Sequence, residues 1–307
     1  MKKALFISQL LLFVVFNFFL LLTVYQITGS KGSADHISYR TPVYNNKEEF
    51  DPSLTRLNSI DELTAYCDSI YTNANHSTAS VSNEELYPEI VNNAISKRFY
   101  HGYSLYGFKS NYMAMLLSQV SVQGLNAIVV PDDIMKYAYA ACSQQSIVMM
   151  EVMKRKGYST RKIGFKSEKY GHFCLEVYYA GSWHFFDPDM EPNMAVAGVT
   201  SRPGIAFLAE HKELLPKLYS KFSLDLVMEL FPNYSYGKAD IFPAPRALFF
   251  QKASQFLSYT MWLYFLAAFI FVRRKYLRLS VTAKKVKAIR TGISKPETPF
   301  ALAPASC

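Results

Sequence analysis

Three residues in the central part of the chain, Cys142, His172 and Asp187, are of the types that form a nucleophilic catalytic triad. In such a triad a thiolate attacks a carbonyl, an imidazole takes and returns the proton, and a carboxylate holds the imidazole tautomer. Each residue alone has an ordinary structural role, since an exported cysteine is usually buried or paired. Chemistry at these residues therefore requires elements that bring the three side chains together.

The cysteine stands at the start of a predicted helix that ends near Gly157. Apolar residues recur at the i, i+3 and i+4 spacing of one helix face, and cations occupy the last turn, where the helix dipole favours them. Gly157 can adopt the left-handed conformation that closes a helix. A thiol in the first turn faces unpaired backbone N–H groups and a positive partial charge, which favour the thiolate. The sequence therefore predicts a reactive Cys142.

A β-hairpin is predicted to carry the other two residues. Two runs rich in aromatic and β-branched residues flank a short turn at residues 180–181. If the turn pairs Tyr179 with Ser182, then Asp187 lies diagonally across from His172 on the same face of the hairpin. We therefore expect the imidazole and the carboxylate to lie within hydrogen-bonding distance.

Further residues accompany these three at a regular spacing. They are Ala141 before the cysteine, Gly157, Arg161 and Gly164 in the next strand, Glu176-Val177-Tyr178 after the histidine, and Trp183 and Pro188 around the aspartate. In this order and spacing the chain resembles the transglutaminase-like superfamily of papain-related cysteine enzymes, with the best match over residues 85–192.

The resemblance implies a role for each of the three residues. Cys142 would be the nucleophile, His172 the general base and then the general acid, and Asp187 the residue that orients the imidazole. Asp189 is the alternative carboxylate, but it falls outside the matching position. The fold class expected is α+β, with a transglutaminase-like, papain-related core in which the helix carrying Cys142 packs on an antiparallel sheet. Two transmembrane helices are expected to flank this core.

Basic residues are concentrated at the two ends of the chain, whose formal net charge is +9. Nine Lys and Arg residues follow residue 272, where Glu297 is the one acidic residue, and Lys2 and Lys3 precede the first apolar run. Residues 28–255 hold 22 basic and 23 acidic residues. Because the excess positive charge lies outside this middle part, a nucleic-acid-binding function loses its main support.

Two apolar runs, residues 4–27 and 256–272, are long enough to cross a bilayer. A cleaved signal peptide is the alternative for the first run, but its length favours a retained anchor. A buried core helix is the alternative for the second run, but the cations at residues 273–275 favour a membrane span. Positive residues at both outer ends predict cytoplasmic termini and an extracytoplasmic middle.

This topology corresponds to a two-pass protein of the cell (inner) membrane, with its domain in the periplasm if the cell is Gram-negative. The expected boundaries are 1–28 for the N-terminal anchor, 29–58 for a linker, 59–250 for the extracytoplasmic domain, 251–273 for the second transmembrane helix and 274–307 for a basic cytoplasmic tail.

Several segments around the expected catalytic core carry more local predictions. Asp132 or Asp133 is expected to cap a short helix that leads to Cys142. Residues 205–222 indicate an amphipathic helix that is interrupted or restarted at Pro216. Four aromatic residues between two predicted helices are expected either to line a substrate groove or, more commonly, to pack in the core: Tyr100, Tyr103, Tyr106 and Phe108.

Three of the four cysteines, Cys67, Cys142 and Cys174, fall in the predicted extracytoplasmic domain, and Cys307 falls in the tail. An oxidising compartment permits a disulfide between Cys67 and Cys174, which would leave Cys142 free. A disulfide between Cys142 and Cys174 is a second pairing, and it would silence the nucleophile.

The sequence thus predicts a membrane-anchored cysteine enzyme that acts on amide bonds of a peptide or protein through a thioester. Hydrolysis by a peptidase or amidase is favoured over transamidation, because water at about 55 M competes with any amine. No cofactor or metal is expected, since the sequence has no phosphate loop and no Cys or His pairs at metal-ligand spacing. The alternative is a non-catalytic scaffold or binding module of a membrane-associated complex. The expected partners are the amide substrate, the lipid bilayer and a protein of such a complex.

Overall fold

The computed structural model describes residues 2–28, 49–75, 83–120, 124–198 and 201–292. The chain divides into two units, one of residues 26–256 and one that combines residues 1–25 with residues 257–307. The predicted linker over residues 29–48, the end of the predicted tail at residues 293–307, and Cys307 lie outside the described residues.

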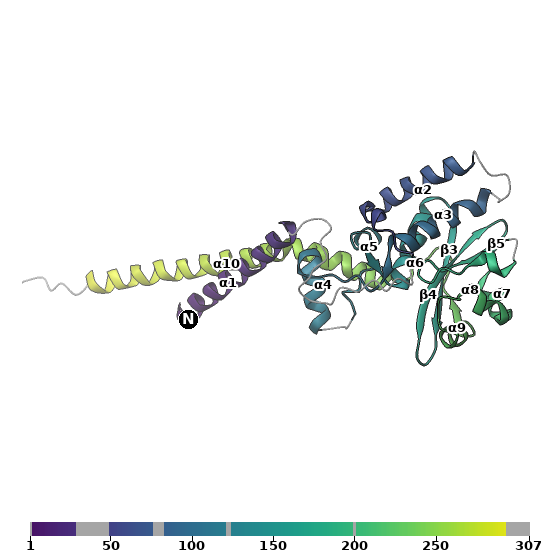
Figure 1. Ribbon diagram of the computed structural model, residues 1–307. Coiled ribbons are helices and arrows are strands. Elements are labelled where there is room, and N and C mark those ends of the chain that lie inside the picture. Colours follow the sequence, from purple (N-terminus) through teal and green to yellow (C-terminus); the bar gives the residue numbers. More distant parts are fainter. Residues whose placement is uncertain (1, 29–48, 76–82, 121–123, 199–200, 293–307) are drawn as a thin grey trace, which may run out of the picture. The chain divides into compact units, whose positions relative to one another are not determined.

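The unit of residues 26–256 is an α+β fold around a four-stranded antiparallel sheet with the strand order β5-β4-β3-β6 (Figure 1). The strands are β3 (Ser159–Lys166), β4 (Gly171–Tyr179), β5 (Ser182–Phe186) and β6 (Tyr234–Tyr236). A separate parallel pair is formed by β1 (Tyr100–His101) and β2 (Tyr139–Ala140).

Helices cover both faces of the sheet, because the side chains of a strand alternate between its two faces. Leu175, Val177 and Tyr179 of β4 belong to one apolar core, which includes buried residues of α2 (Ile60–Asn75), α3 (Asn83–Arg98) and α6 (Cys142–Arg155). Ile163 and Phe165 of β3 belong to a second core on the other face. Its helices are α7 (Ile205–Glu210), α8 (Leu215–Leu218) and α9 (Leu224–Leu230).

The hairpin of β4 and β5 has the predicted register. Tyr179 pairs with Ser182, and the last paired residues before the loop are Leu175 and Phe186. The predicted helix after Cys142 is also confirmed as α6. It is followed by Gly157 at a φ of 83°, and the Tyr158 N–H donates to the Met153 carbonyl in a helix-closing turn.

The prediction that an aspartate caps the short helix α5 (Pro131–Ile134) is wrong. The residue that precedes the helix is Val130, and no side chain caps it. Asp132 instead accepts a hydrogen bond from the Ile60 N–H at 2.9 Å, and Asp133 accepts one from the Tyr106 hydroxyl at 2.5 Å. Both carboxylates thus bind donors from distant segments of the chain.

Two other segments differ from their predicted form. The predicted helix over residues 205–222 consists of three short pieces: α7, a 3-10 turn η3 (Lys212–Leu214) and α8. Residues 50–58, counted with the linker, contain the turn η1 (Pro52–Arg56), which places Leu54 and Leu57 in the core with α3. Two further 3-10 and helical segments complete this unit: η2 (Met194–Ala197) and α4 (Phe108–Val120).

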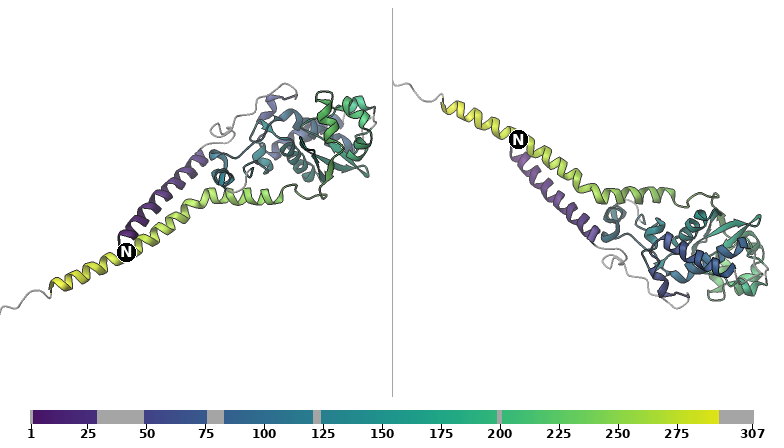
Figure 2. Two further views of the ribbon diagram at one scale, coloured as in Figure 1. Left: turned by 90° about the horizontal axis from the view of Figure 1, so that it is seen from below. Right: turned by 90° about the horizontal axis from the view of Figure 1, so that it is seen from above.

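The second unit contains α1 (Lys2–Thr28) and most of α10 (Pro245–Gly292). By length and composition, residues 2–28 and 245–284 are candidate membrane spans. The two helices run side by side in Figure 2 and pack through aromatic pairs such as Phe13 with Phe269 and Phe19 with Phe265. Because Phe6 contacts Tyr276 and Thr23 bonds to Ser258, the helices are antiparallel.

Arg98 ties together three backbone segments of the core and yields a prediction for stability. Its guanidinium, on a residue 1% exposed, donates to the carbonyls of Leu57, Tyr137 and Met135. We expect Arg98→Met to lower the free energy of unfolding by about 3 kcal/mol, because buried carbonyls lose their donors. The exposed Arg56 is the matched control, and Arg56→Met should change the free energy by less than about 0.5 kcal/mol. Urea unfolding of the detergent-solubilised chain, followed by near-UV circular dichroism, measures both, and equal effects would contradict the prediction.

Candidate active site

The first turn of α6 places Cys142 at the edge of the sheet, with 8% of its surface exposed. The turn is held by Gln144, a residue to which the sequence analysis gave no role. Its amide oxygen accepts from the N–H groups of Ser104 and Ala141, and its amide nitrogen donates to the carbonyls of Ser104 and Ile128. One buried side chain therefore joins the segment before Cys142 to two other loops.

His172, near the start of β4, is also 8% exposed and is bound to the fully buried Asp187. The distance between His172 Nε2 and Asp187 Oδ2 is 2.9 Å. Asp187 also accepts a hydrogen bond from the Met190 N–H at 3.1 Å and one from the Tyr219 hydroxyl at 3.2 Å. Tyr219 follows α8, and no signal in its sequence neighbourhood indicated that it would reach this carboxylate.

Cys142 lies close to the His172 imidazole. The Cys142 sulfur, a ring nitrogen of His172 and a carboxylate oxygen of Asp189 all lie within 4.8 Å of one another. Because Nε2 is engaged by Asp187, Nδ1 is the ring nitrogen that remains for the thiol. The structure thus brings the three predicted residues together in the order thiol, imidazole, carboxylate.

Asp189, the alternative carboxylate, lies on the thiol side of the site. It is hydrogen bonded to His101 Nδ1 at 2.9 Å and accepts a hydrogen bond from the Gln145 amide at 2.8 Å. The carboxylate that binds the His172 imidazole is therefore that of Asp187, while Asp189 borders the space in front of Cys142.

The charges of His172 and Asp187 stabilise each other in the protein interior. Burial disfavours the imidazolium, but the Asp187 carboxylate, together with hydrogen bonds to Asp187 and Cys142, raises the pKa of His172 well above its usual value. Burial also disfavours the carboxylate, but the charge and the hydrogen bond of His172 lower the pKa of Asp187. The pair is therefore an imidazolium and a carboxylate at neutral pH.

Cys174 is buried beside this pair, and burial raises the pKa of its thiol well above the usual value. It stays a thiol at neutral pH and does not compete as a nucleophile. The three cysteines that the structure describes are free. The pairing of Cys67 with Cys174 is not formed, because Cys67 lies in the core with α2 while Cys174 lies in the core on the other face of the sheet.

The aromatic residues between the two predicted helices differ in their burial, and a substrate groove lined by them stays a prediction. Tyr106 is 1% exposed and packs in the core, whereas Tyr103 is 56% exposed. The pKa of Tyr103 is raised by partial burial and by the nearby charges of Cys142 and Asp189, which places this side chain at the rim of the site.

The other residues of the sequence pattern hold the sheet together. Arg161 of β3 binds the Glu176 carboxylate at 2.7 Å and lies against the rings of Trp183 and Tyr236. Glu176 in turn accepts a hydrogen bond from the Ile205 N–H at 2.8 Å, which attaches the start of α7 to β4. These residues therefore support the strands that carry the site.

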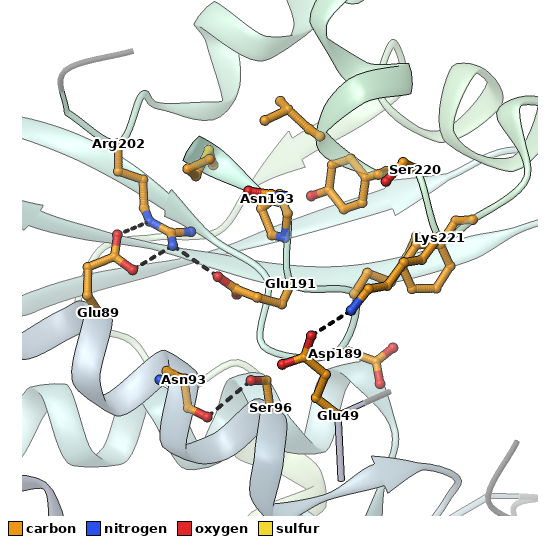
Figure 3. Close-up of a pocket in the computed structure, with 16 residues that line it drawn as sticks. Glu49, Glu89, Asn93, Ser96, Asp189, Glu191, Asn193, Arg202, Ser220 and Lys221 are labelled. Atoms are coloured by element: carbon orange, nitrogen blue, oxygen red, sulfur yellow. Dashed lines mark hydrogen bonds and ion pairs between the residues drawn. The ribbon is translucent and has the colours of Figure 1, made fainter. Parts of the chain in front are cut away.

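A cavity of about 480 Å³ adjoins the site and is shown in Figure 3. Its wall includes Asp189 and Tyr219, which contact the site directly, and the pair of Glu191 and Arg202. Although the Glu191 carboxylate borders the cavity, desolvation by the surrounding protein outweighs the favourable charge of Arg202 and raises the pKa of Glu191 to about 7.

Among the residues that the structure describes, two sets of three side chains lie close enough together to hold a metal ion. Cys142, His172 and Asp189 form one set, and His172, Cys174 and Asp187 form the other. Sulfur, imidazole nitrogen and carboxylate oxygen together are donors that suit zinc. The sequence held no signal of this, because each set comes from separate elements. The expectation of no metal stays a prediction.

Comparisons with protein-family models, curated proteins and solved structures find no match to this chain. The resemblance to the transglutaminase-like superfamily therefore stays a prediction, carried by the sequence pattern alone.

The charge coupling predicts the titration of His172. In Asp187→Asn the carboxylate charge is lost while burial remains, so the pKa of His172 should fall from well above 6.5 to below that value. NMR titration of the chain labelled with ¹⁵N in the histidine rings measures the pKa of His172 in the wild type and in the variant. An unchanged pKa in the variant would contradict the coupling.

The same coupling predicts how stability depends on pH. Because the pKa of His172 is raised in the folded state, the stabilisation from the pair is complete below about pH 6.5, the unfolded value, and is lost as the pH rises through the folded value. At the acidic end it is lost as the pH falls through the lowered pKa of Asp187. The difference in unfolding free energy between the wild type and Asp187→Asn should therefore shrink at both ends of a pH series. A difference that is constant with pH would contradict this.

Proposed function

We propose that this protein is a membrane-anchored cysteine enzyme that transfers acyl groups from amide bonds of a peptide or protein. The proposal rests on one observation: Cys142 at a helix start lies beside an imidazole that binds a buried carboxylate at 2.9 Å. A scaffold gains no stability from placing a thiol next to a buried imidazolium, and an acyl-transfer enzyme requires both.

The proposed reaction begins when the Cys142 thiolate attacks the amide carbonyl. The Cys142 N–H lies in the first turn of α6, where backbone N–H groups have no acceptor within the helix, and it donates to the oxyanion. His172 then gives its proton to the leaving amine as the C–N bond breaks, which leaves a thioester on Cys142. Water, deprotonated by His172, attacks the thioester and releases a carboxylic acid and the thiol.

Hydrolysis is the favoured outcome, and transamidation follows the same course with an amine in place of water. The core proposed for this chemistry is transglutaminase-like and papain-related: a helix that carries the nucleophile packed on an antiparallel sheet that carries the histidine. The contacts of α6 with β4 and the hairpin register of β4 and β5 support it.

We place the domain outside the cytoplasm, in a two-pass protein whose termini are both cytoplasmic. The antiparallel packing of α1 with α10 supports this, because Lys2 and Lys3 then lie at the same end of the helix pair as the cations at residues 273–275. Positive residues that flank membrane spans remain in the cytoplasm.

The proposal is tested by the rate of iodoacetamide alkylation at Cys142, followed by mass spectrometry of the peptide that contains it. In the full chain in detergent we expect Cys142 to be alkylated rapidly near pH 7, because the charged His172 favours the reactive thiolate. In His172→Ala the rate at this pH should fall at least about tenfold.

His211→Ala is the matched control, because His211 directly follows α7 and contacts Phe207 of that helix, away from Cys142. It should leave the alkylation profile of Cys142 unchanged. An alkylation rate at Cys142 that does not change in His172→Ala would rule out the enzyme and favour the scaffold function.

A further inference from the structure

The cavity beside the site presents an acidic wall. Its lining includes four carboxylates against two cations: Glu49, Glu89, Asp189 and Glu191 against Arg202 and Lys221. The volume of about 480 Å³ lies within the range of small-molecule and side-chain pockets. The charged groups on its surface decide what it can hold.

Arg202 does not present its charge to the cavity. Its side chain is 2% exposed, and its N–H groups donate to both Glu89 oxygens, to Glu191 and to the Phe185 carbonyl. The side chains of Glu89 and Glu191 are 35% and 36% exposed. Figure 3 shows the guanidinium held between these two carboxylates. The charged groups that an occupant meets on this side of the cavity are therefore the carboxylates of Glu89 and Glu191.

Lys221 is the other cation of the lining, and its charge is balanced by an ion pair with Glu49. Its ammonium group binds the Glu49 carboxylate at 2.9 Å, and both side chains are exposed to solvent. Asp189 adds a further negative charge on the side of the thiol. The electrostatic balance of the cavity is therefore negative.

Two buried acceptors next to the wall have no donor among the described residues. They are the amide oxygens of Asn92 and Gln145. The amide nitrogen of Asn92 donates to Glu191, and that of Gln145 donates to Asp189. These two amides therefore position the carboxylates of Glu191 and Asp189, and a group with several N–H donors complements the carboxylate oxygens that border the cavity.

We propose that this cavity is a substrate subsite for a positively charged side chain, an ammonium or a guanidinium group, of the amide that Cys142 attacks. The subsite rests on the proposed function, because it assigns the same thiol as the nucleophile. Asp189 connects the two, since its carboxylate lines the cavity and lies within 4.8 Å of the Cys142 sulfur. Substrates with an anionic group in this position are repelled by the wall.

The test compares two thiol reagents of similar size and opposite charge on the full chain in detergent. They are 2-aminoethyl methanethiosulfonate, a cation, and 2-sulfonatoethyl methanethiosulfonate, an anion, each normalised to its rate with free cysteine. At about pH 8, where Glu191 is mostly ionised, the cation should modify Cys142 at least about tenfold faster than the anion. Mass spectrometry of the Cys142 peptide measures both rates.

Two variants should shift this rate ratio in opposite directions. Glu191→Gln removes a negative charge from the wall and should lower the ratio about threefold. Lys221→Gln removes the cation that neutralises Glu49 and should raise it. Glu210→Gln is the control. It changes the net charge by the same amount as Glu191→Gln, but at an exposed position at the end of α7 and outside the cavity, so it should leave the ratio unchanged.

Two outcomes would overturn the subsite: a normalised rate for the anion that equals or exceeds that of the cation, or a ratio that is the same in all three variants. The Lys221 variant keeps the test decisive if Glu191→Gln does not fold. The proposed function fails separately, since it fails only when the alkylation rate of Cys142 is indifferent to His172. Loss of the charge preference with an intact His172 effect overturns the subsite alone.

Discussion

The contact between His172 and Asp187 is the interaction on which the site depends. An imidazolium and a carboxylate buried together are costly to desolvate, and they persist only when each has further partners. Here the Met190 N–H and the Tyr219 hydroxyl donate further hydrogen bonds to the Asp187 carboxylate. The pair therefore requires the hairpin register, the loop after β5 and the segment after α8 at the same time. An error in any of these elements would leave a charge buried without its partner.

The site lies where the two cores of the domain meet. Cys142 is carried by α6, which packs in the core with α2 and α3, whereas Tyr219 and Cys174 belong to the core on the other face of the sheet. The imidazole stands at the start of the strand between these layers. Both layers must therefore be folded before the thiol, the imidazole and the carboxylate come together, which couples the geometry of the site to the stability of the whole domain.

One short loop after β5 supplies three carboxylates with different partners. Asp187 binds the imidazole, Asp189 binds His101 and Gln145 near the thiol, and Glu191 binds Arg202 and Asn92 at the cavity. Because residues 188–190 form a turn and not an extended strand, these three acids at alternate positions can face separate partners. The same segment thus orients the base, borders the nucleophile and forms the wall of the proposed subsite.

Local patterns determined the helix after Cys142 and the hairpin that aligns His172 with Asp187, because helix spacing, a closing glycine and a two-residue turn are properties of neighbouring residues. They did not determine the roles of Asp132 and Asp133, whose partners are donors from distant segments, or the strand β6, which forms only where β3 offers an edge. Tyr219, Gln144 and the acidic cavity were likewise invisible in the sequence. Their contacts join residues tens of positions apart, and only the packing of the two layers against the sheet brings those residues together.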